Sequence, residues 1–340
     1  MEESGHYYTV YYTSLAVGFA NDIAQRQALL TQMPDEVGWL DAANMHIDQC
    51  ANRPVSYTAA FIFGPVGEYI ADNHFMEYNL EGKKQRVPAD WRYTIEFALH
   101  SLKDPGSGVV SSKNQRKLTR DLLINNAPDS LAFGLLLHRL GDTYAHSIMN
   151  NESQMYTTTK SDSITQCVVL ESLGHARDGH NPDYPYKRQD LFFEYLKDLY
   201  DILKTKFHDS SISYKKRKIP LSFDELKNAF ASIFQNLKST YQRPNIRIGR
   251  GGMMMTGGPP ITEEINPELV IKDFIAAIRS KCFQTLQVNM DKYAPETIEK
   301  QTLGEFLNDH PDLKKIIDAN KLEAQIKLIH RQLDEHSGSW

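Results

Sequence analysis

Residues 131–149, with the sequence LAFGLLLHRLGDTYAHSIM, are the most informative segment of the chain. Its apolar stripe, continued in steps of three and four residues, leads to His138, Asp142 and then Ala145 or His146. Ionisable side chains therefore occupy the helix face that should meet the core. Because burying an imidazole or a carboxylate without partners is costly, these groups must bond to one another or to other polar groups, or bind a metal ion.

The spacing of His138 and Asp142 suits two ligands of one ion, because residues i and i+4 lie side by side on a helix. His146, one turn further, is placed to serve a second ion a few Å away. Gly134 and Gly141 allow another part of the chain to come close. The alternative is a buried, hydrogen-bonded His–Asp pair, and for a single pair we regard it as the commoner case.

The distribution of histidines favours the metal site over a single buried pair. Of the 12 histidines, most fall in the first 180 residues. The segment 174–183, GHARDGHNPD, concentrates two imidazoles and two carboxylates in a turn. Imidazole and carboxylate are a usual ligand mixture for divalent metals. The histidines with short polar or aromatic neighbours are His6, His74, His138, His146, His175 and His180.

Amphipathic helices dominate the rest of the chain. Ser222 and Glu225 form a capping box, and Pro267 stands where a helix should begin. Strand-like alternation is scarce, with Ser56–Phe63 the best candidate. The sequence therefore predicts an all-α, multi-helix fold. The stretches with helical spacing of apolar residues are Phe192–Phe207, Leu226–Leu237, Val270–Cys282 and Leu322–Leu333.

The length of 340 residues allows two domains or one large helical domain. We expect a metal-binding catalytic domain over residues 1–220. A helical accessory region over residues 221–340 follows, as a separate unit or packed on the same core. The polar segment 150–163 and the Gly- and Met-rich segment 247–260 are expected to be loops.

Charge and hydropathy exclude several classes of protein. The net charge is -5, which argues against a broad nucleic-acid-binding surface. No apolar run is long enough to span a membrane, and the amino-terminal residues lack the pattern of a secretory signal. We expect a cytoplasmic protein from the sequence as written, with leaderless export left open. The three cysteines are scattered and fit small buried side chains rather than a disulfide framework or a thiolate site.

The order of the short motifs carries a resemblance to a known family. The segment HRLGDTYAH at 138–146 follows an apolar helical run and precedes Gly174-His175 and Pro182-Asp183. This arrangement resembles the zinc-dependent phospholipase C and single-strand nuclease superfamily. It resembles more closely a bacterial branch in which an HYY segment, here residues 6–8, precedes a Q-x-x-D motif, here residues 32–35. The resemblance covers roughly the first 190 residues.

The resemblance implies a helical bundle of the phospholipase C type with a helical carboxyl-terminal extension and a cleft that holds two or three zinc ions. Asp142 would be a bridging or shared ligand, and Asp35 would orient or deprotonate the attacking water. The last ligand of the family pattern is an acidic residue four positions after a histidine, which here is His175. Gly179 occupies that position, so Asp178 or Asp183 must substitute. The other implied ligands are His138 and His74 on one ion, His146 and His175 on another, and His6 near a third. His180 and Asp41 are additional candidates.

The chemistry predicted from these residues is phosphoester hydrolysis by metal-activated water. The substrate would be a phospholipid, with transient contact to a membrane surface, or another phosphodiester. A single-strand nuclease or nucleotidase, and a non-catalytic helical binding protein, are the alternatives. Tyr7 and Tyr8 are candidates to line a choline-like or base-stacking pocket, although packing in the core is the commoner role of such residues. We interpret His100 as a helix-end histidine.

Overall fold

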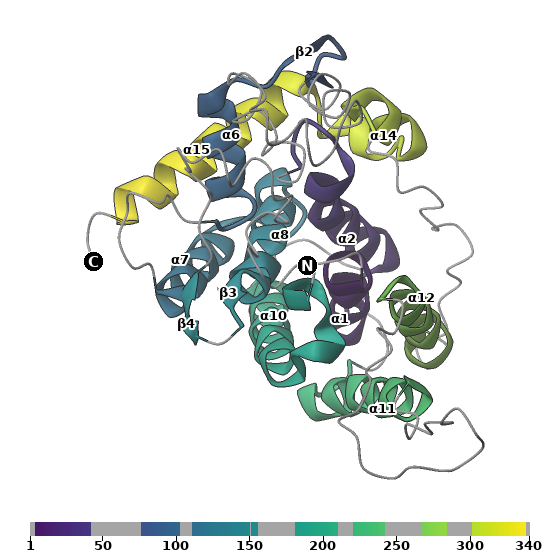
Figure 1. Ribbon diagram of the computed structural model, residues 1–340. Coiled ribbons are helices and arrows are strands. Elements are labelled where there is room, and N and C mark those ends of the chain that lie inside the picture. Colours follow the sequence, from purple (N-terminus) through teal and green to yellow (C-terminus); the bar gives the residue numbers. More distant parts are fainter. Residues whose placement is uncertain are drawn as a thin grey trace, which may run out of the picture.

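The computed structural model describes residues 4–41, 76–102, 111–149, 151–155, 181–209, 220–241, 267–283 and 301–337. Within these ranges the fold is all-α, which confirms the prediction (Figure 1). The main hydrophobic core is one continuous cluster with side chains from Tyr7 to Leu333. Residues after 221 therefore share a core with the amino-terminal part. No helix in the described ranges is long and apolar enough to cross a membrane.

Helix α8 (Leu131–Ala145) lies in the middle of the molecule (Figure 1). All of its residues are buried, which agrees with the apolar side chains that α8 itself carries on nearly every face. It begins at Ser130, whose hydroxyl accepts a hydrogen bond from the Phe133 N–H. The helices packed against it are α2 (Asn21–Glu36), α7 (Ser112–Asn125), α10 (Gln189–Asp209) and α15 (Ala319–Ser337).

The amino-terminal elements wrap the central helix from one side. The described residues begin with a short π-helix, η1 (Ser4–Tyr8), which continues directly into α1 (Thr9–Val17). Helix α2 then crosses α8 very closely, because a β-carbon at Gly134 would lie 2.1 Å from Cβ of Leu30. Only glycine allows this approach, as the sequence predicted for position 134.

A second pair of helices, α6 (Ala89–Ala98) and α15, covers another side of the core. The carboxyl-terminal part also holds the segment that follows α2. The backbone N–H of Gln301 donates to the carbonyl of Glu36 at 2.8 Å, and the N–H of Gly38 donates to the carbonyl of Gln301 at 3.0 Å. Residues 36–38 are thereby fixed by a part of the chain far away in sequence. Two short elements lie between Gln301 and α15 in the chain: α14 (Leu303–Asp309) and η6 (Leu313–Lys315).

Two predicted helix starts are confirmed. Helix α11 (Phe223–Tyr241) follows a complete capping box, in which Glu225 accepts from the Ser222 N–H at 2.8 Å and Ser222 accepts from the Glu225 N–H at 3.3 Å. Helix α12 (Pro267–Ala277) begins at its proline. The remaining helical elements are η3 (Asn181–Asp183), η4 (Pro185–Lys187) and η5 (Ile278–Phe283).

Strands are short in the described ranges. β1 (Met76–Tyr78) pairs with β2 (Lys84–Arg86), and β3 (Ser147–Ile148) pairs with β4 (Asn151–Met155), both antiparallel. The prediction of a loop over 150–163 is therefore wrong for residues 151–155. The proposed strand Ser56–Phe63 and the segment 247–260 lie outside the described residues.

Candidate metal centre

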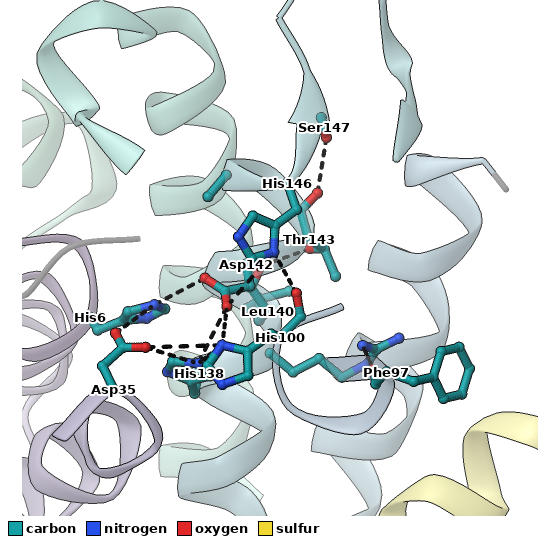
Figure 2. A network of polar contacts seen from close by, with 12 residues as sticks. His6, Asp35, Phe97, His100, His138, Leu140, Asp142, Thr143, His146 and Ser147 are labelled. Atoms are coloured by element: carbon teal, nitrogen blue, oxygen red, sulfur yellow. Dashed lines mark hydrogen bonds and ion pairs between the residues drawn. The ribbon is translucent and has the colours of Figure 1, made fainter. Parts of the chain in front are cut away.

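Five side chains of metal-ligand type converge beside the middle of α8 (Figure 2). They come from four parts of the chain: His6 from η1, Asp35 from the last turn of α2, His100 from just beyond α6, and His138 and Asp142 from α8. They form two groups in which all ligand atoms lie within 4.8 Å of one another. One group is His6, His138 and Asp142, and the other is Asp35, His100 and His138.

Three atoms at the centre of the cluster lie unusually close together. Nε2 of His138 is 3.3 Å from Oδ2 of Asp142, and Nδ1 of His100 is 3.2 Å from the same oxygen. The two ring nitrogens are 3.2 Å apart. Ligands of a tetrahedral zinc ion at about 2.0–2.1 Å lie roughly 3.3 Å from one another, so the triangle has the dimensions of one face of a zinc site.

In His138 and His100, the ring nitrogen that points away from the cluster determines which nitrogen carries hydrogen. Nδ1 of His138 lies 2.8 Å from the carbonyl of Thr31, and Nε2 of His100 lies 2.8 Å from the carbonyl of Leu40. Because a carbonyl oxygen only accepts hydrogen bonds, both outer nitrogens carry hydrogen. In the neutral rings the inner nitrogens therefore present lone pairs to a carboxylate oxygen. A backbone carbonyl behind the ring is a usual way to orient a metal-binding histidine.

The other oxygen of Asp142 and both oxygens of Asp35 face the histidines of the cluster. Oδ1 of Asp142 is 3.0 Å from Nε2 of His6. Oδ2 of Asp35 is 3.7 Å from that same nitrogen, and Oδ1 of Asp35 is 3.7 Å from Nε2 of His138 and 3.9 Å from Nδ1 of His100. Figure 2 shows the resulting ring of contacts around the cluster.

Burial shapes the protonation of the cluster. The Asp35 side chain is 25% exposed, whereas those of the other four are 4% exposed or less, so Asp35 is the most exposed member of the cluster. Burial lowers the pKa of His6 well below its usual value and raises the pKa of Asp35. Burial would also raise the pKa of Asp142, but the surrounding positive charge outweighs it and holds that pKa well below the usual range.

The pKa of His100 responds to opposing influences. Burial would lower it, yet the hydrogen bond to Asp142 and the charges of Asp142 and Asp35 raise it above its usual value. The two carboxylates thus favour a positive charge at this position. A bound proton or a metal cation supplies that charge.

Local sequence explains how His6 and Asp35 reach the cluster. A β-carbon at Gly141 would lie 2.9 Å from Cε1 of His6, so glycine makes room for the ring. The ring of His6 also stacks on that of His138, with centroids 4.1 Å apart. Pro34 has no N–H to bond inside α2 and therefore weakens its last turn, where Asp35 stands.

His146 lies at the edge of the cluster. Its Nδ1–H donates to the carbonyl of His100, and this nitrogen is 3.9 Å from Oδ2 of Asp142. Arg188 fixes the backbone around it by donating to the carbonyls of Ala145 at 3.1 Å and Ser147 at 2.7 Å. His146 belongs to neither of the two groups above.

Four predicted residues are therefore brought together: His6, Asp35, His138 and Asp142. Asp41 and Asp183 are buried, but neither belongs to the two ligand groups of the described residues. The side chains of Tyr7 and Tyr8 are 0% and 1% exposed. These values agree with packing in the core rather than with lining an open pocket. His74, His175, Asp178 and His180 lie outside the described residues.

His100 is the member of the cluster that the sequence interpretation missed. Its position just beyond α6 agrees with a helix-end histidine, but its ring turns inward to Asp142. The available signal was weak: His100 is an ionisable residue within the mostly apolar run FALHSL at 97–102.

Comparisons with known proteins assign the chain to a family but give it no activity. A family model described as a family of unknown function (DUF6765) matches residues 1–338. No curated protein and no solved structure matches.

Proposed function

The chain belongs to this family of unknown function, and we propose from its site that it is a metal-dependent phosphoesterase that hydrolyses a phosphodiester. The metal would be zinc, with two or three ions bound. The first substrate class is a phospholipid, which the protein would cleave as a phospholipase C does. The site residues of this proposal are His6, Asp35, His100, His138 and Asp142, with His146 at its edge.

The observation that carries the proposal is the triangle formed by His138, His100 and Asp142. Its three acceptor atoms lie 3.2–3.3 Å apart, and backbone carbonyls take the hydrogens of both rings on their outer sides. Acceptors that face one another in a buried site repel unless a cation or a proton lies between them. A zinc ion fits the spacing and satisfies all three atoms.

The ligand types support a catalytic ion. Imidazole and carboxylate ligands suit zinc and similar divalent metals. When bound, such an ion supplies Lewis-acid chemistry and lowers the pKa of water to about 7. The chain's own part is to hold the imidazoles in place through the carbonyls of Thr31 and Leu40, and to bury every member of the cluster except Asp35.

The substrate class rests on sequence. The segment HRLGDTYAH resembles the metal-binding segment of zinc-dependent phospholipases C, which cleave phosphodiesters. The net charge of -5 favours a neutral or zwitterionic headgroup over a polyanion. A phosphocholine or phosphoethanolamine lipid is therefore the first substrate to test.

Metal content tests the proposal most directly. The zinc in purified protein, measured by elemental mass spectrometry, should reach two or more equivalents and fall in His138→Asn and Asp142→Asn. The pair His330 and Asp334 on α15 has the same i, i+4 spacing and lies outside both ligand groups, so His330→Asn with Asp334→Asn is a matched control and should keep the metal. No bound metal after zinc is supplied would overturn the proposal.

Activity is measured next on the same proteins. Release of phosphocholine from phosphatidylcholine vesicles should follow the zinc content across the variants. Hydrolysis of single-stranded nucleic acid in place of lipid would move the assignment to a nuclease with the same metal centre. A zinc-loaded protein that hydrolyses no phosphodiester would contradict the proposed activity.

A further inference from the structure

We propose that the backbone of Gln301 positions two members of the cluster, Asp35 and His100, so that the carboxyl-terminal part of the chain helps to form the candidate site rather than being an accessory region. Gln301 does so through its two hydrogen bonds to residues 36–38, here called the clasp. The positioning itself requires no bound metal, whereas its effect on metal affinity rests on the proposed function.

The clasp joins the backbone of Gln301 to the turn that follows α2. The N–H of Gln301 donates to the carbonyl of Glu36 at 2.8 Å, and the N–H of Gly38 donates to the carbonyl of Gln301 at 3.0 Å. Val37, between these two residues, forms a parallel β-bridge with Gln301. Because both bonds are made by backbone groups, a change of the Gln301 side chain leaves them in place unless it removes the N–H.

Asp35 lies directly before the clasped residues. The last carbonyls of a helix have no partner within that helix. In α2 the N–H of Gln301 supplies the missing donor for the carbonyl of Glu36, one residue after Asp35. The clasp therefore stabilises the end of the helix from which the Asp35 carboxylate reaches Nε2 of His6 and Nε2 of His138, each at 3.7 Å.

The same turn carries the carbonyl that orients His100. The N–H of Leu40 donates to the carbonyl of Val37 at 2.8 Å, which closes residues 37–40 as one turn. The carbonyl of Leu40 then accepts from Nε2 of His100 at 2.8 Å. A shift of this turn would move the acceptor, and with it the ring whose Nδ1 lies 3.2 Å from Oδ2 of Asp142.

A second contact brings the carboxyl-terminal part to the same imidazole. Helix α6, which ends just before His100, packs against α15 (Figure 1). The hydroxyl of Thr94 on α6 lies 3.3 Å from Nδ1 of His330 on α15. Trp91 on α6 donates from Nε1 to the carbonyl of Trp39 at 3.1 Å, so α6 and the clasped turn are joined directly. The carboxyl-terminal part therefore holds both segments that position His100.

Gln301→Pro tests the clasp, because proline has no N–H to donate to Glu36. Gln301→Ala is the matched control, since it removes the side chain and keeps both backbone bonds. Nuclear magnetic resonance of metal-free protein with isotope-labelled histidine detects the ring hydrogens, and His100→Gln assigns the signal of that ring. In Gln301→Pro the Nε2–H of His100 should exchange with solvent roughly 10-fold faster, as expected for the loss of one hydrogen bond.

His138 is the internal reference for this measurement. Its Nδ1–H bonds to the carbonyl of Thr31 inside α2 and should keep its wild-type exchange rate in Gln301→Pro. Gln301→Ala should leave both rings unchanged. An equal acceleration at both rings would mean that Gln301 only adds to overall stability, and an unchanged rate at His100 would mean that the clasp does not position it. Either result would overturn the inference.

Zinc affinity is measured next on the same proteins. The dissociation constant should rise roughly 10- to 100-fold in Gln301→Pro, as is usual when the groups that orient metal ligands are lost, and stay unchanged in Gln301→Ala. A zinc affinity that is equal in all three proteins would contradict the effect on the site. A wild-type protein that binds no zinc would end the proposed function, whereas the exchange rates would still decide whether the clasp positions His100.

A second variant and a measurement on the wild type cover a failure of Gln301→Pro to fold. Gly38→Pro removes the other bond of the clasp and should accelerate the same ring hydrogen. In the wild type, the backbone N–H groups of Gln301 and Gly38 should open to exchange with the same free energy as the ring N–H of His100. Independent opening of the clasp and the ring would overturn the inference.

Discussion

Gly141 leaves the space that the imidazole of His6 fills: a β-carbon at position 141 would lie 2.9 Å from Cε1 and 3.0 Å from Nδ1 of that ring. Gly141→Ala should therefore push His6 out of the cluster. We expect the variant to fold, with a free energy of unfolding lower by about 1–3 kcal/mol, which is typical of overpacking. It should also bind at least one metal equivalent fewer. Elemental mass spectrometry and urea unfolding measure the two effects.

Gly304→Ala is the control for this change. Gly304 lies in α14, where an added β-carbon would meet its nearest neighbour at 3.8 Å, an ordinary contact distance. Alanine favours a helix over glycine by up to about 1 kcal/mol, so stability should stay equal or rise, with the metal content unchanged. A Gly141→Ala protein with its full complement of metal would show that His6 is not a ligand.

The elements that sequence predicts well are those whose signals are local. Ser222 with Glu225 marks the start of α11, and Pro267 marks the start of α12. β4 carries no such signal, because its residues are mostly polar and exposed. It is held instead by its pairing with β3 and by the Ser112 hydroxyl, which donates to the carbonyl of Glu152 at 2.6 Å. Both contacts depend on the tertiary structure.

The same distinction applies to the cluster. His138 and Asp142 are one turn apart on a buried helix face, so their proximity follows from helical spacing. His100 bonds to Asp142 across 42 residues, and His6 does so across 136 residues. No periodicity relates these positions, and His6 was named only through the resemblance and the clustering of histidines. Its contact with Asp142 is set by the packing of η1 against α8.

Removal of metal should destabilise the protein. Without a cation, the acceptor atoms of His138, His100 and Asp142 face one another at 3.2–3.3 Å. Free zinc at about 1,000 times its dissociation constant should stabilise the fold by about 4 kcal/mol. Thermal unfolding should show a higher Tm with zinc than with chelator. His138→Asn should lose most of this difference, and an equal Tm in both conditions for the wild type would contradict the expectation.

Arg139 is a second buried charge on α8, and it ties three helices together. Its guanidinium donates to the carbonyl of Phe97 at the end of α6 and to the side chain of Gln115 on α7. Burial lowers its pKa to about 9, so it stays charged at neutral pH. Arg139→Met leaves both acceptors without this donor and should destabilise the fold by about 2–4 kcal/mol.

A double-mutant cycle tests that account of Arg139. Gln115→Leu removes one of the two acceptors, so Arg139→Met combined with Gln115→Leu should destabilise the fold by less than the sum of the single changes. Urea unfolding of the four proteins gives the interaction energy. Simple additivity would mean that the bond between Arg139 and Gln115 adds no stability.

His330 on α15 provides a pH dependence that is separate from the metal centre. The ring lies 3.3 Å from the hydroxyl of Thr94 and 3.4 Å from Asp334, with Arg139 contributing positive charge nearby. Burial lowers its pKa below the ordinary 6.5, and the charge of Asp334 offsets this only in part. The unfolded chain therefore takes up the proton more readily, and stability falls as pH decreases below about 6.5.

The variant His330→Gln removes this titration and keeps a polar side chain. Between about pH 7.5 and about pH 5.5, its Tm should fall less than that of the wild type. The comparison is made with chelator present, so that metal binding does not add its own pH dependence. The other histidines titrate equally in both proteins and cancel in the difference. Parallel Tm curves for the two proteins would show that His330 takes up a proton as readily in the folded protein as in the unfolded chain.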